Sequence, residues 1–434
     1  MDNILVVSFT FLGLLAFFLG STVWISFSLF VVSLIGMSLF TSINAFKVLA
    51  NILWNSTASP TLFALPLFVF MGEIIFRSNL SSNLFKGLSP WLNKLPGRLL
   101  HVTVVASAMF AAVSGSSAAT CATVGQIVIP EMDKRNYNRG IVLGTLGGSG
   151  TLGFLIPPSM VMIVYGITAN VSIGQLFVAG IIPGLIIAGT FMVYIMVRCL
   201  INPGLAPPDD SHYSLNDYIM SLPLILPVIL LISTVLGSIY LGWATPTEAA
   251  AVGVLGSLLF AYINRSLKWD TFQVAIMGSI KTSCMILFIV ASATYLSVVV
   301  GYLGIPSSLT RYIAELGLSP YMLLIILSVM YLILGCLLDG FSMVVMSIPI
   351  ALPLIGLAGY DPLWFGIYLV IMIQISQITP PVGFNLFVIN GITGENIFKV
   401  ARSTTPLFLL MLLVASLLAV YPEIVLYLPR LMIR

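Results

Sequence analysis

Charged residues are scarce in this chain: they make up 7% of its 434 residues, whereas 59% are hydrophobic. A soluble protein carries about 25% charged residues, because its surface must face water. The scarcity of charge therefore excludes a soluble fold and indicates that most of the surface faces lipid. The net charge of +3 gives no indication of a nucleic-acid partner.

Cysteine is also rare, with four residues that form no CxxC pair and lie in or beside apolar runs. We therefore expect neither a disulfide framework nor a transition-metal site. The sequence has no P-loop, no HExxH and no GxSxG motif, and no two carboxylates lie together in an apolar run. These absences predict a protein that is not an enzyme, has no cofactor and does not hydrolyse ATP.

Long apolar runs predict an all-α polytopic membrane protein. Ten of them are assigned as spans, at 4–20, 23–40, 61–76, 140–169, 173–198, 219–241, 246–264, 284–303, 363–392 and 404–428. Two further runs, 99–129 and 320–356, are interrupted near their middles by polar or small residues. Each half is shorter than the roughly 20 residues that a span needs. Each of these two runs therefore predicts a re-entrant hairpin.

Two of the spans are themselves expected to be broken. The span at 140–169 contains Pro157-Pro158, and the span at 363–392 contains Pro380-Pro381. A proline pair removes two backbone donors and frees the carbonyls behind it. Unwound backbone at membrane depth is tolerated only where protein or a water-filled cavity surrounds it.

Three polar segments remain between the spans. Residues 42–57 and 266–282 carry cations and a tryptophan, which is typical of amphipathic arms lying in the membrane interface. Residues 202–217 are rich in proline and acidic residues, and we predict that they form a cytoplasmic linker. This linker divides the chain into a first half, 1–201, and a second half, 218–434.

The two halves share short motifs in the same order, which predicts an internal repeat. Four matches recur at offsets of 223 to 230 positions: Gly87-Leu88-Ser89-Pro90-Trp91 with Gly317-Leu318-Ser319-Pro320-Tyr321, Gly115 with Gly340, Pro157-Pro158 with Pro380-Pro381, and Gly166-Ile167-Thr168 with Gly391-Ile392-Thr393. Each half holds five spans, one of them broken, and a hairpin that returns to its own side. Because five is odd, the second half enters from the opposite face, so the repeats are inverted.

The distribution of cations agrees with inversion. Following the spans places all but Lys47, Arg311, Arg430 and Arg434 of the 17 lysines and arginines on one side, the cytoplasm by the positive-inside rule. The loop after the first hairpin contains three cations, whereas the equivalent loop around Asp361 contains none. Repeated sequence with opposite charge bias is what inversion requires.

Inverted repeats with interrupted helices are the architecture of secondary transporters. A half-helix N-terminus offers N–H groups and a positive dipole end to an anion, while freed carbonyls and hydroxyls offer oxygen to sodium. The first tip supplies Ser114, Ser116, Ser117 and Thr120, and the second region supplies Asp339, Ser342, Thr379 and Asn385. We expect a small anion to be moved with a sodium gradient. Gln374 and Gln377 precede the second proline pair, and one of them is a candidate for lining the cavity.

Asp339 is the one carboxylate placed near mid-membrane, and three interpretations of it stay open. It can ligate sodium, carry a proton or simply cap the hairpin tip. Two other pairs are expected to be structural: Glu73 and Arg77 at helical i,i+4 spacing, and Thr245 with Glu248 in a capping box.

Several stretches together resemble the large membrane (DctM-like) subunit of tripartite ATP-independent periplasmic (TRAP) transporters. They are SGSS at 114–117, GGSGTLGFLIPPS at 147–159, AGIIPG at 179–184, ATPTEAAAVG at 244–253, GCLLD ending at Asp339, and ITPPVGFNL at 378–386. The resemblance covers essentially the whole chain.

The resemblance implies a location in the bacterial inner membrane and sodium-driven import of an organic acid, such as sialic acid or a C4-dicarboxylate. It also implies two partners, a small four-helix membrane subunit and a periplasmic substrate-binding protein. The implied fold is an elevator-type ion transporter, in which hairpins and broken helices move against a scaffold.

The expected site residues follow from the tips, the breaks and this resemblance. Substrate is expected at Ser114, Gly115, Ser116, Ser117, Pro157, Pro158, Thr379, Pro380, Pro381 and Asn385. Sodium is expected at Ser114, Ser117, Gly148, Gly150, Asp339, Gly340, Thr379, Val382 and Gly383. No metal other than sodium is expected.

Two alternatives remain beside this hypothesis. One is a stand-alone divalent-anion/sodium symporter of the related fold, which would transport without a binding protein. The other is a channel or an intramembrane enzyme. A channel would pass currents far above carrier turnover, and an enzyme would need a catalytic dyad at membrane depth.

Overall fold

A computed structural model describes residues 2–21, 23–58, 60–207, 213–336, 338–380 and 383–432. Within these ranges every regular element is a helix, so the predicted all-α architecture is confirmed. The predicted site residues Pro381 and Val382, and residues 208–212 of the predicted linker, lie outside the described residues.

The first half of the chain contains ten α-helices and two short 3₁₀ helices among its described residues. They are α1 (Asp2–Gly20), α2 (Ile25–Phe40), α3 (Ala45–Thr57), η1 (Pro60–Phe63), α4 (Ala64–Arg77), α5 (Leu80–Leu92), α6 (Leu99–Ser114), α7 (Ser117–Lys134), α8 (Arg139–Gly150), η2 (Thr151–Phe154), α9 (Met160–Ala169) and α10 (Ile173–Ile201). A third 3₁₀ helix, η3 (Pro203–Leu205), follows α10.

The second half continues with ten more α-helices in its described part. They are α11 (Leu215–Tyr240), α12 (Pro246–Ile263), α13 (Trp269–Tyr302), α14 (Ile305–Glu315), α15 (Pro320–Gly335), α16 (Gly340–Leu357), α17 (Pro362–Gln377), α18 (Phe384–Thr393), α19 (Ile397–Val420) and α20 (Glu423–Met432).

Six of the described helices are long and apolar enough to cross a membrane, namely α10, α11, α12, α13, α16 and α19. A seventh span results if α4 and α5, which meet at a bend of 68°, are counted as one. The remaining apolar helices have 10–17 residues. They include α2, which was predicted as a whole span, and the helices α6, α9, α15, α17 and α18 of the predicted hairpins and broken spans. α16, predicted as half of a hairpin, is long enough to cross. Helix breaks coincide with the predicted tips, since α6 ends at Ser114 and α16 begins at Gly340.

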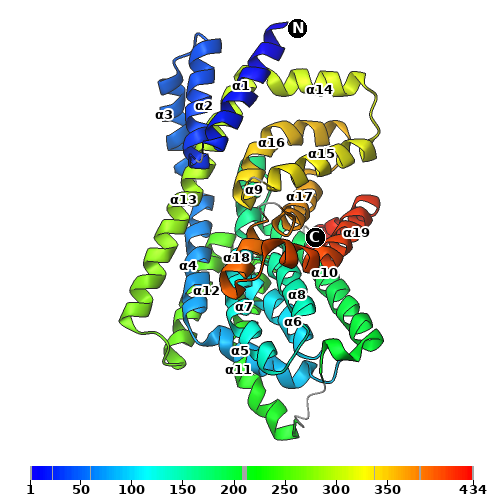
Figure 1. The fold of residues 1–434 in the computed structure, drawn as a ribbon. Coiled ribbons are helices and arrows are strands. Elements are labelled where there is room, and N and C mark those ends of the chain that lie inside the picture. The colour runs from blue at the N-terminus through cyan, green and yellow to red at the C-terminus, as the bar shows by residue number, and fades with distance from the viewer. Residues whose placement is uncertain are drawn as a thin grey trace.

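The halves pack against each other in reciprocal pairs. α4 packs on α12 and α2 on α13; α7 packs on α18 and α16 on α9; α8 packs on α19 and α17 on α10. Within each of these three couples, replacing both helices of one contact by their counterparts in the other half gives the second contact. Figure 1 shows α5, α6 and α11 at one end of the molecule and α1, α14 and α15 at the other. The predicted inverted repeats would produce this arrangement.

The structure differs from the sequence prediction around 266–303. The predicted arm at 266–282 and the predicted span at 284–303 are one uninterrupted helix of 34 residues, α13. No proline lies between Trp269 and Tyr302, so nothing interrupts the hydrogen-bond ladder where the polarity changes. Two other helices, α5 and α14, were not predicted, because they are short and mix polar with apolar residues.

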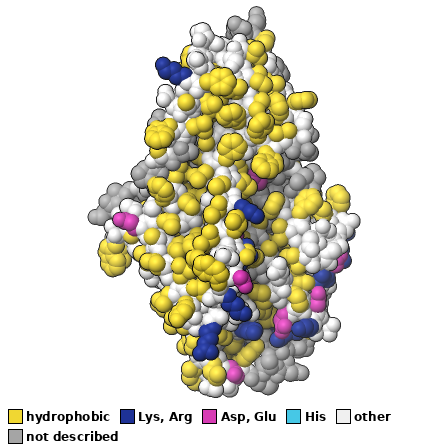
Figure 2. All heavy atoms as spheres, turned by 90° about the vertical axis from the view of Figure 1, so that its left-hand side faces the viewer, with side chains coloured by type: hydrophobic (Ala, Val, Ile, Leu, Met, Phe, Trp, Pro, Cys, Tyr) yellow, Lys and Arg dark blue, Asp and Glu magenta, His cyan; other side chains and the backbone are white. Residues whose placement is uncertain are grey.

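Hydrophobic side chains cover most of the face drawn in Figure 2, and the lysines and arginines gather toward its lower end. Large apolar residues stand exposed along the outward faces of α11 and α12, among them Leu226, Leu230, Leu255 and Leu259. In water such a surface would be unstable, whereas in a bilayer it contacts acyl chains.

Candidate functional site

The first hairpin turns sharply at Gly115. This residue caps α6 in the left-handed conformation, with φ of 60°, which glycine adopts without strain. A Cβ at this position would lie 2.8 Å from the carbonyl oxygen of Pro158, so only glycine allows the tip to approach the first break. The Met160 amide donates to the Gly115 carbonyl at 3.3 Å. The tip and the first break are thus joined through their backbones.

Hydroxyl groups line this tip. Ser114 Oγ lies 2.9 Å from Thr120 Oγ1, and Thr120 Oγ1 donates to the Ser116 carbonyl at 2.8 Å. Ser116 is the N-cap of α7 and accepts from the Ala119 amide. Ser114, Ser117 and Thr120 are buried. Their oxygens form a compact group of the kind that can replace the hydration of a small cation.

The first tip is tied to the second half of the chain. Asn385, near the start of α18, donates from Nδ2 to Ser117 Oγ at 2.8 Å, and Ser117 Oγ donates to Asn385 Oδ1 at 3.2 Å. Both side chains are fully buried. Asn385 therefore belongs with the first tip, although it follows the second proline pair in sequence.

The second hairpin is capped by a carboxylate. Asp339 is the N-cap of α16: Oδ2 accepts from the Phe341 amide at 3.0 Å, and Oδ1 accepts from the Ser342 hydroxyl. Of the three interpretations of Asp339, the capping role is therefore observed. A cap leaves lone pairs on both oxygens, so it is compatible with cation binding.

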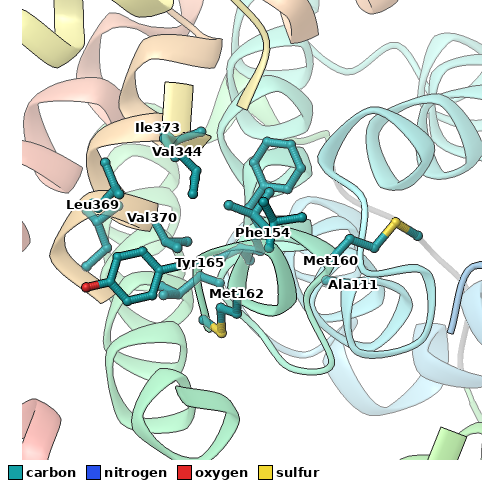
Figure 3. Close-up of a cluster of buried hydrophobic side chains, with 14 of the residues drawn as sticks. Ala111, Phe154, Met160, Met162, Tyr165, Val344, Leu369, Val370 and Ile373 are labelled. Carbon is teal, nitrogen blue, oxygen red and sulfur yellow. The ribbon is translucent and has the colours of Figure 1, made fainter. Parts of the chain in front are cut away.

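The second hairpin reaches both breaks. A Cβ at Gly340 would lie 3.0 Å from Ile373 of α17 and 3.1 Å from Phe154 of η2. Cys336 Sγ donates to the carbonyl of Pro380 at 3.4 Å. Figure 3 shows Phe154, Met160, Val344 and Ile373 in one buried apolar cluster, each side chain coming from a different element. This cluster holds the second tip against the breaks.

The second break unwinds after a tightened turn. The Thr379 hydroxyl donates to the Ile375 carbonyl at 2.7 Å, and the Gly383 amide donates to the Thr379 carbonyl at 3.0 Å. Pro380 is exposed and Thr379 is half-buried, whereas Pro157 and Pro158 at the first break are buried. Pro380 is thus more exposed than either proline of the first break.

The structure places two predicted sodium residues differently from the rest. A Cβ at Gly148 would lie 2.3 Å from Leu407 of α19, and a Cβ at Gly150 would lie 2.8 Å from Cys121 of α7. Both glycines allow close helix packing behind the first tip. The Gly148 carbonyl accepts from Thr151 Oγ1 at 2.7 Å, so that oxygen is already engaged.

Four helices begin at this centre: α7 after Ser116, α9 after Ser159, α16 after Asp339 and α18 after Gly383. The contacts given above link all four starts. Each N-terminus carries a partial positive charge and unpaired amides. The arrangement can therefore stabilise a small anion beside oxygen atoms that suit a cation.

Sequence reasoning missed several residues of this centre. Ser159 donates to the Phe154 carbonyl at 2.5 Å and caps α9 by accepting from the Met162 amide. Phe154 contacts the second tip from the first break, and Ser376 lies against Gly335 of the second hairpin. Ser159 is a residue type that commonly caps helices, so its role could have been predicted from the sequence. The other two depend on contacts between distant segments.

Ion pairs lie at the predicted cytoplasmic end of α7 and α8. Arg139, at the start of α8, pairs with Asp133 at 2.6 Å and with Glu395 at 3.5 Å, and Lys399 pairs with Glu395 at 2.8 Å. The hydrogen bond from Lys399, helped by Arg139, lowers the pKa of Glu395. These pairs join the ends of α7, α8 and α19.

A family model described as "Tripartite ATP-independent periplasmic transporter, DctM component" matches residues 11–424. The C4-dicarboxylate TRAP transporter large permease protein DctM of Pseudomonas aeruginosa is 34% identical over 385 residues, covering 88% of this chain and 90% of that protein. The sialic acid TRAP transporter large permease protein SiaM of Vibrio cholerae is 30% identical over 376 residues, covering 86% of each chain.

Two further comparisons concern a longer relative and the fold. The isethionate TRAP transporter permease protein DctMQ of Oleidesulfovibrio alaskensis is 32% identical, covering 86% of this chain and 59% of that protein. Among solved structures, the YdaH transporter of Alcanivorax borkumensis has a TM-score of 0.62 at 13% identity and covers 86% of both chains. At that identity the likeness concerns the fold.

Proposed function

Since the chain belongs to the DctM component family of TRAP transporters, and is thus a multi-pass transport protein of the bacterial inner membrane rather than an enzyme, we propose that it imports a small organic acid with sodium. The observation that carries this proposal is the meeting of four helix N-termini at the two tips and two breaks. Helix N-termini favour anions, and a carboxylate fits this environment.

Sodium coupling is supported by the oxygen groups beside these N-termini. Ser114, Thr120 and the Asp339 carboxylate supply hard oxygen ligands, which suit alkali cations better than thiolate or imidazole ligands do. A sodium ion bound next to the anion offsets its charge. Moving one net charge across 100 mV supplies about 2.3 kcal/mol, enough to drive accumulation of roughly 50-fold.

An elevator motion is proposed on the basis of the packing. One group of helices packs mainly within itself. It consists of the hairpin helices α6, α7, α15 and α16, the broken-span helices α8, α9, α17 and α18, and the helices α10 and α19. α2, α4, α12 and α13 form the second packed group. We assign the first group as the moving unit and the second as the scaffold.

Two partners are proposed. A small membrane subunit is proposed to associate with this chain, because the family is that of the TRAP large permeases. A periplasmic binding protein is proposed to deliver the acid, as the family description implies. The relatives' substrates, C4-dicarboxylate at 34% identity and sialic acid at 30%, define the two acids to test first.

The test is uptake into proteoliposomes that contain this chain and its small subunit. We expect uptake of a labelled acid to require both an inward sodium gradient and the binding protein. A potassium gradient of equal size is the control. Equal uptake under sodium and potassium would refute the coupling, and uptake without the binding protein would favour a stand-alone symporter.

The inverted topology has its own test. Cysteine is introduced at Arg135 and at Asp361, which occupy equivalent loops of the two halves. We expect a membrane-impermeant thiol reagent to label Asp361→Cys from the periplasm and Arg135→Cys only after the membrane is opened. Labelling of both from the same side would exclude inversion.

A further inference from the structure

Gln374 is a buried amide without partners. Its side chain is 0% exposed, and neither Oε1 nor Nε2 has a hydrogen-bond partner. Asn385 is buried to the same extent, yet both ends of its amide are bonded to Ser117. Since about 90% or more of buried polar groups in proteins are bonded, two unbonded atoms on one side chain need an explanation.

The backbone around Gln374 is also short of donors. The amides of Ile378 and Thr379 donate to the carbonyls of Ile375 and Ser376, three residues earlier. In a regular α-helix the amide of Ile378 would donate to the carbonyl of Gln374 instead. The tightened turn therefore withdraws the usual helical donor from Gln374, and main-chain and side-chain oxygens of one residue are left without their usual donors.

The location favours a positive ligand. Gln374 lies in the last turn of α17, which ends at Gln377 where the second break begins. The C-terminal end of a helix carries a partial negative charge and unpaired carbonyls. Amide and carbonyl oxygens are hard ligands of the kind that alkali cations prefer.

The surroundings favour a small ligand over another part of the protein. The elements that pack against α17 include α9, α10, α15, α16, α18 and α19, all assigned above to the moving unit. If that unit moves as one body, the neighbours of Gln374 stay the same throughout the cycle. A partner that comes and goes must then be an ion or a molecule of similar size.

The repeat supplies an internal comparison. The offset that aligns Pro380 with Pro157 aligns Gln374 with Thr151 of η2. The Thr151 hydroxyl donates to the Gly148 carbonyl at 2.7 Å, so the polar group of the first half is satisfied by its own helix. The equivalent group of the second half is not.

We propose that Gln374 is a ligand of a monovalent cation held at the C-terminal end of α17. The inference rests on the sodium coupling proposed above and adds a side chain that neither tip nor proline pair contains. The side-chain oxygen and the main-chain carbonyl of Gln374, which has lost its usual helical donor, would share the ion.

The experiment measures how sodium chloride raises the thermal unfolding temperature of the purified full chain, with choline chloride keeping the ionic strength constant. Gln374→Met has nearly the same length and no hydrogen-bonding atoms. We expect it to unfold at an equal or higher temperature without sodium, because a buried unbonded amide is gone. We expect its half-saturating sodium concentration to rise roughly 10-fold or more.

Two further variants make the result specific. Gln374→Glu keeps an oxygen at the position of Oε1, and we expect it to keep the sodium response. Thr145→Val, on α8, removes a fully buried hydroxyl that likewise has no partner, and we expect an unchanged half-saturating concentration.

The outcomes separate this inference from the proposed function. A wild-type protein that responds to sodium, with Gln374→Met responding at the same concentrations, overturns the inference alone. Loss of the response in Gln374→Glu as well as in Gln374→Met also overturns it, because the oxygens would then not be what matters. A wild-type protein indifferent to sodium overturns both the coupling and the inference.

Discussion

Ser117 and Asn385 form a hydrogen-bonded side-chain pair between the first tip and α18. Ser117→Ala removes the hydroxyl that serves both ends of the Asn385 amide, at 2.8 and 3.2 Å. The amide stays buried, so its desolvation is no longer compensated. We expect a loss of about 1–3 kcal/mol in the free energy of unfolding, which is the usual penalty for an unsatisfied buried group.

A double-mutant cycle measures the link itself. Asn385→Leu alone leaves the Ser117 hydroxyl without its partner, whereas the double variant removes both polar groups. We therefore expect the double variant to lose less than the sum of the single losses, by about 0.5–3 kcal/mol. The assay is reversible unfolding in detergent by denaturant, read by tryptophan fluorescence, with sodium-driven uptake measured in parallel.

Thr123→Val is the matched control on α7. Thr123 is also buried, but its hydroxyl donates only to the Ala119 carbonyl of its own helix. We expect a much smaller loss than for Ser117→Ala. If the two single variants add to within about 0.3–0.5 kcal/mol in the double variant, the proposed link between tip and α18 is refuted.

Three other predictions concern the turn, the second tip and the ion pairs. Gly115→Ala should abolish uptake and lower the unfolding temperature, because its Cβ would meet the Pro158 carbonyl. Gly391→Ala is the control and should do neither, because a Cβ there would have nothing within 4 Å. Equal effects of the two variants would contradict this prediction. Asp339→Asn keeps a capping oxygen, so expression should persist while sodium activation of uptake weakens; unchanged activation would remove Asp339 from the sodium site. Glu395 has a lowered pKa in the folded protein, so its contribution to stability is present above about pH 4.3 and disappears as the pH falls through the folded pKa. Glu395→Gln should therefore reduce the fall in unfolding temperature that occurs at acidic pH. An unchanged fall would exclude this contribution of Glu395.

Local signals in the sequence predicted local structure well. The Thr245–Glu248 capping box is confirmed, with the Thr245 amide donating to Glu248 at 2.8 Å. The i,i+4 pair of Glu73 and Arg77 is confirmed at 2.9 Å. Both depend only on residues within one helical turn, so no knowledge of the fold is needed to recognise them.

Contacts between distant segments could not be read in the same way. Asn385 was predicted as a site residue, but its pairing with Ser117, 268 positions away, appears only in the folded chain. The continuity of α13 was missed for a different reason. A change in polarity alters which solvent surrounds a helix, but it does not end the helix.

The length of α13 has a consequence for the lipid environment. At 1.5 Å per residue its 34 residues extend about 51 Å, against a hydrocarbon thickness of about 30 Å. Even at a tilt of about 40°, the upper end of the usual range, it spans about 39 Å along the membrane normal, so its polar first third lies among headgroups. Exposed aromatic residues at both ends, Trp269 and Tyr302, anchor it there. Hydrophobic mismatch then acts directly on this helix, and the activity of the protein should depend on bilayer thickness.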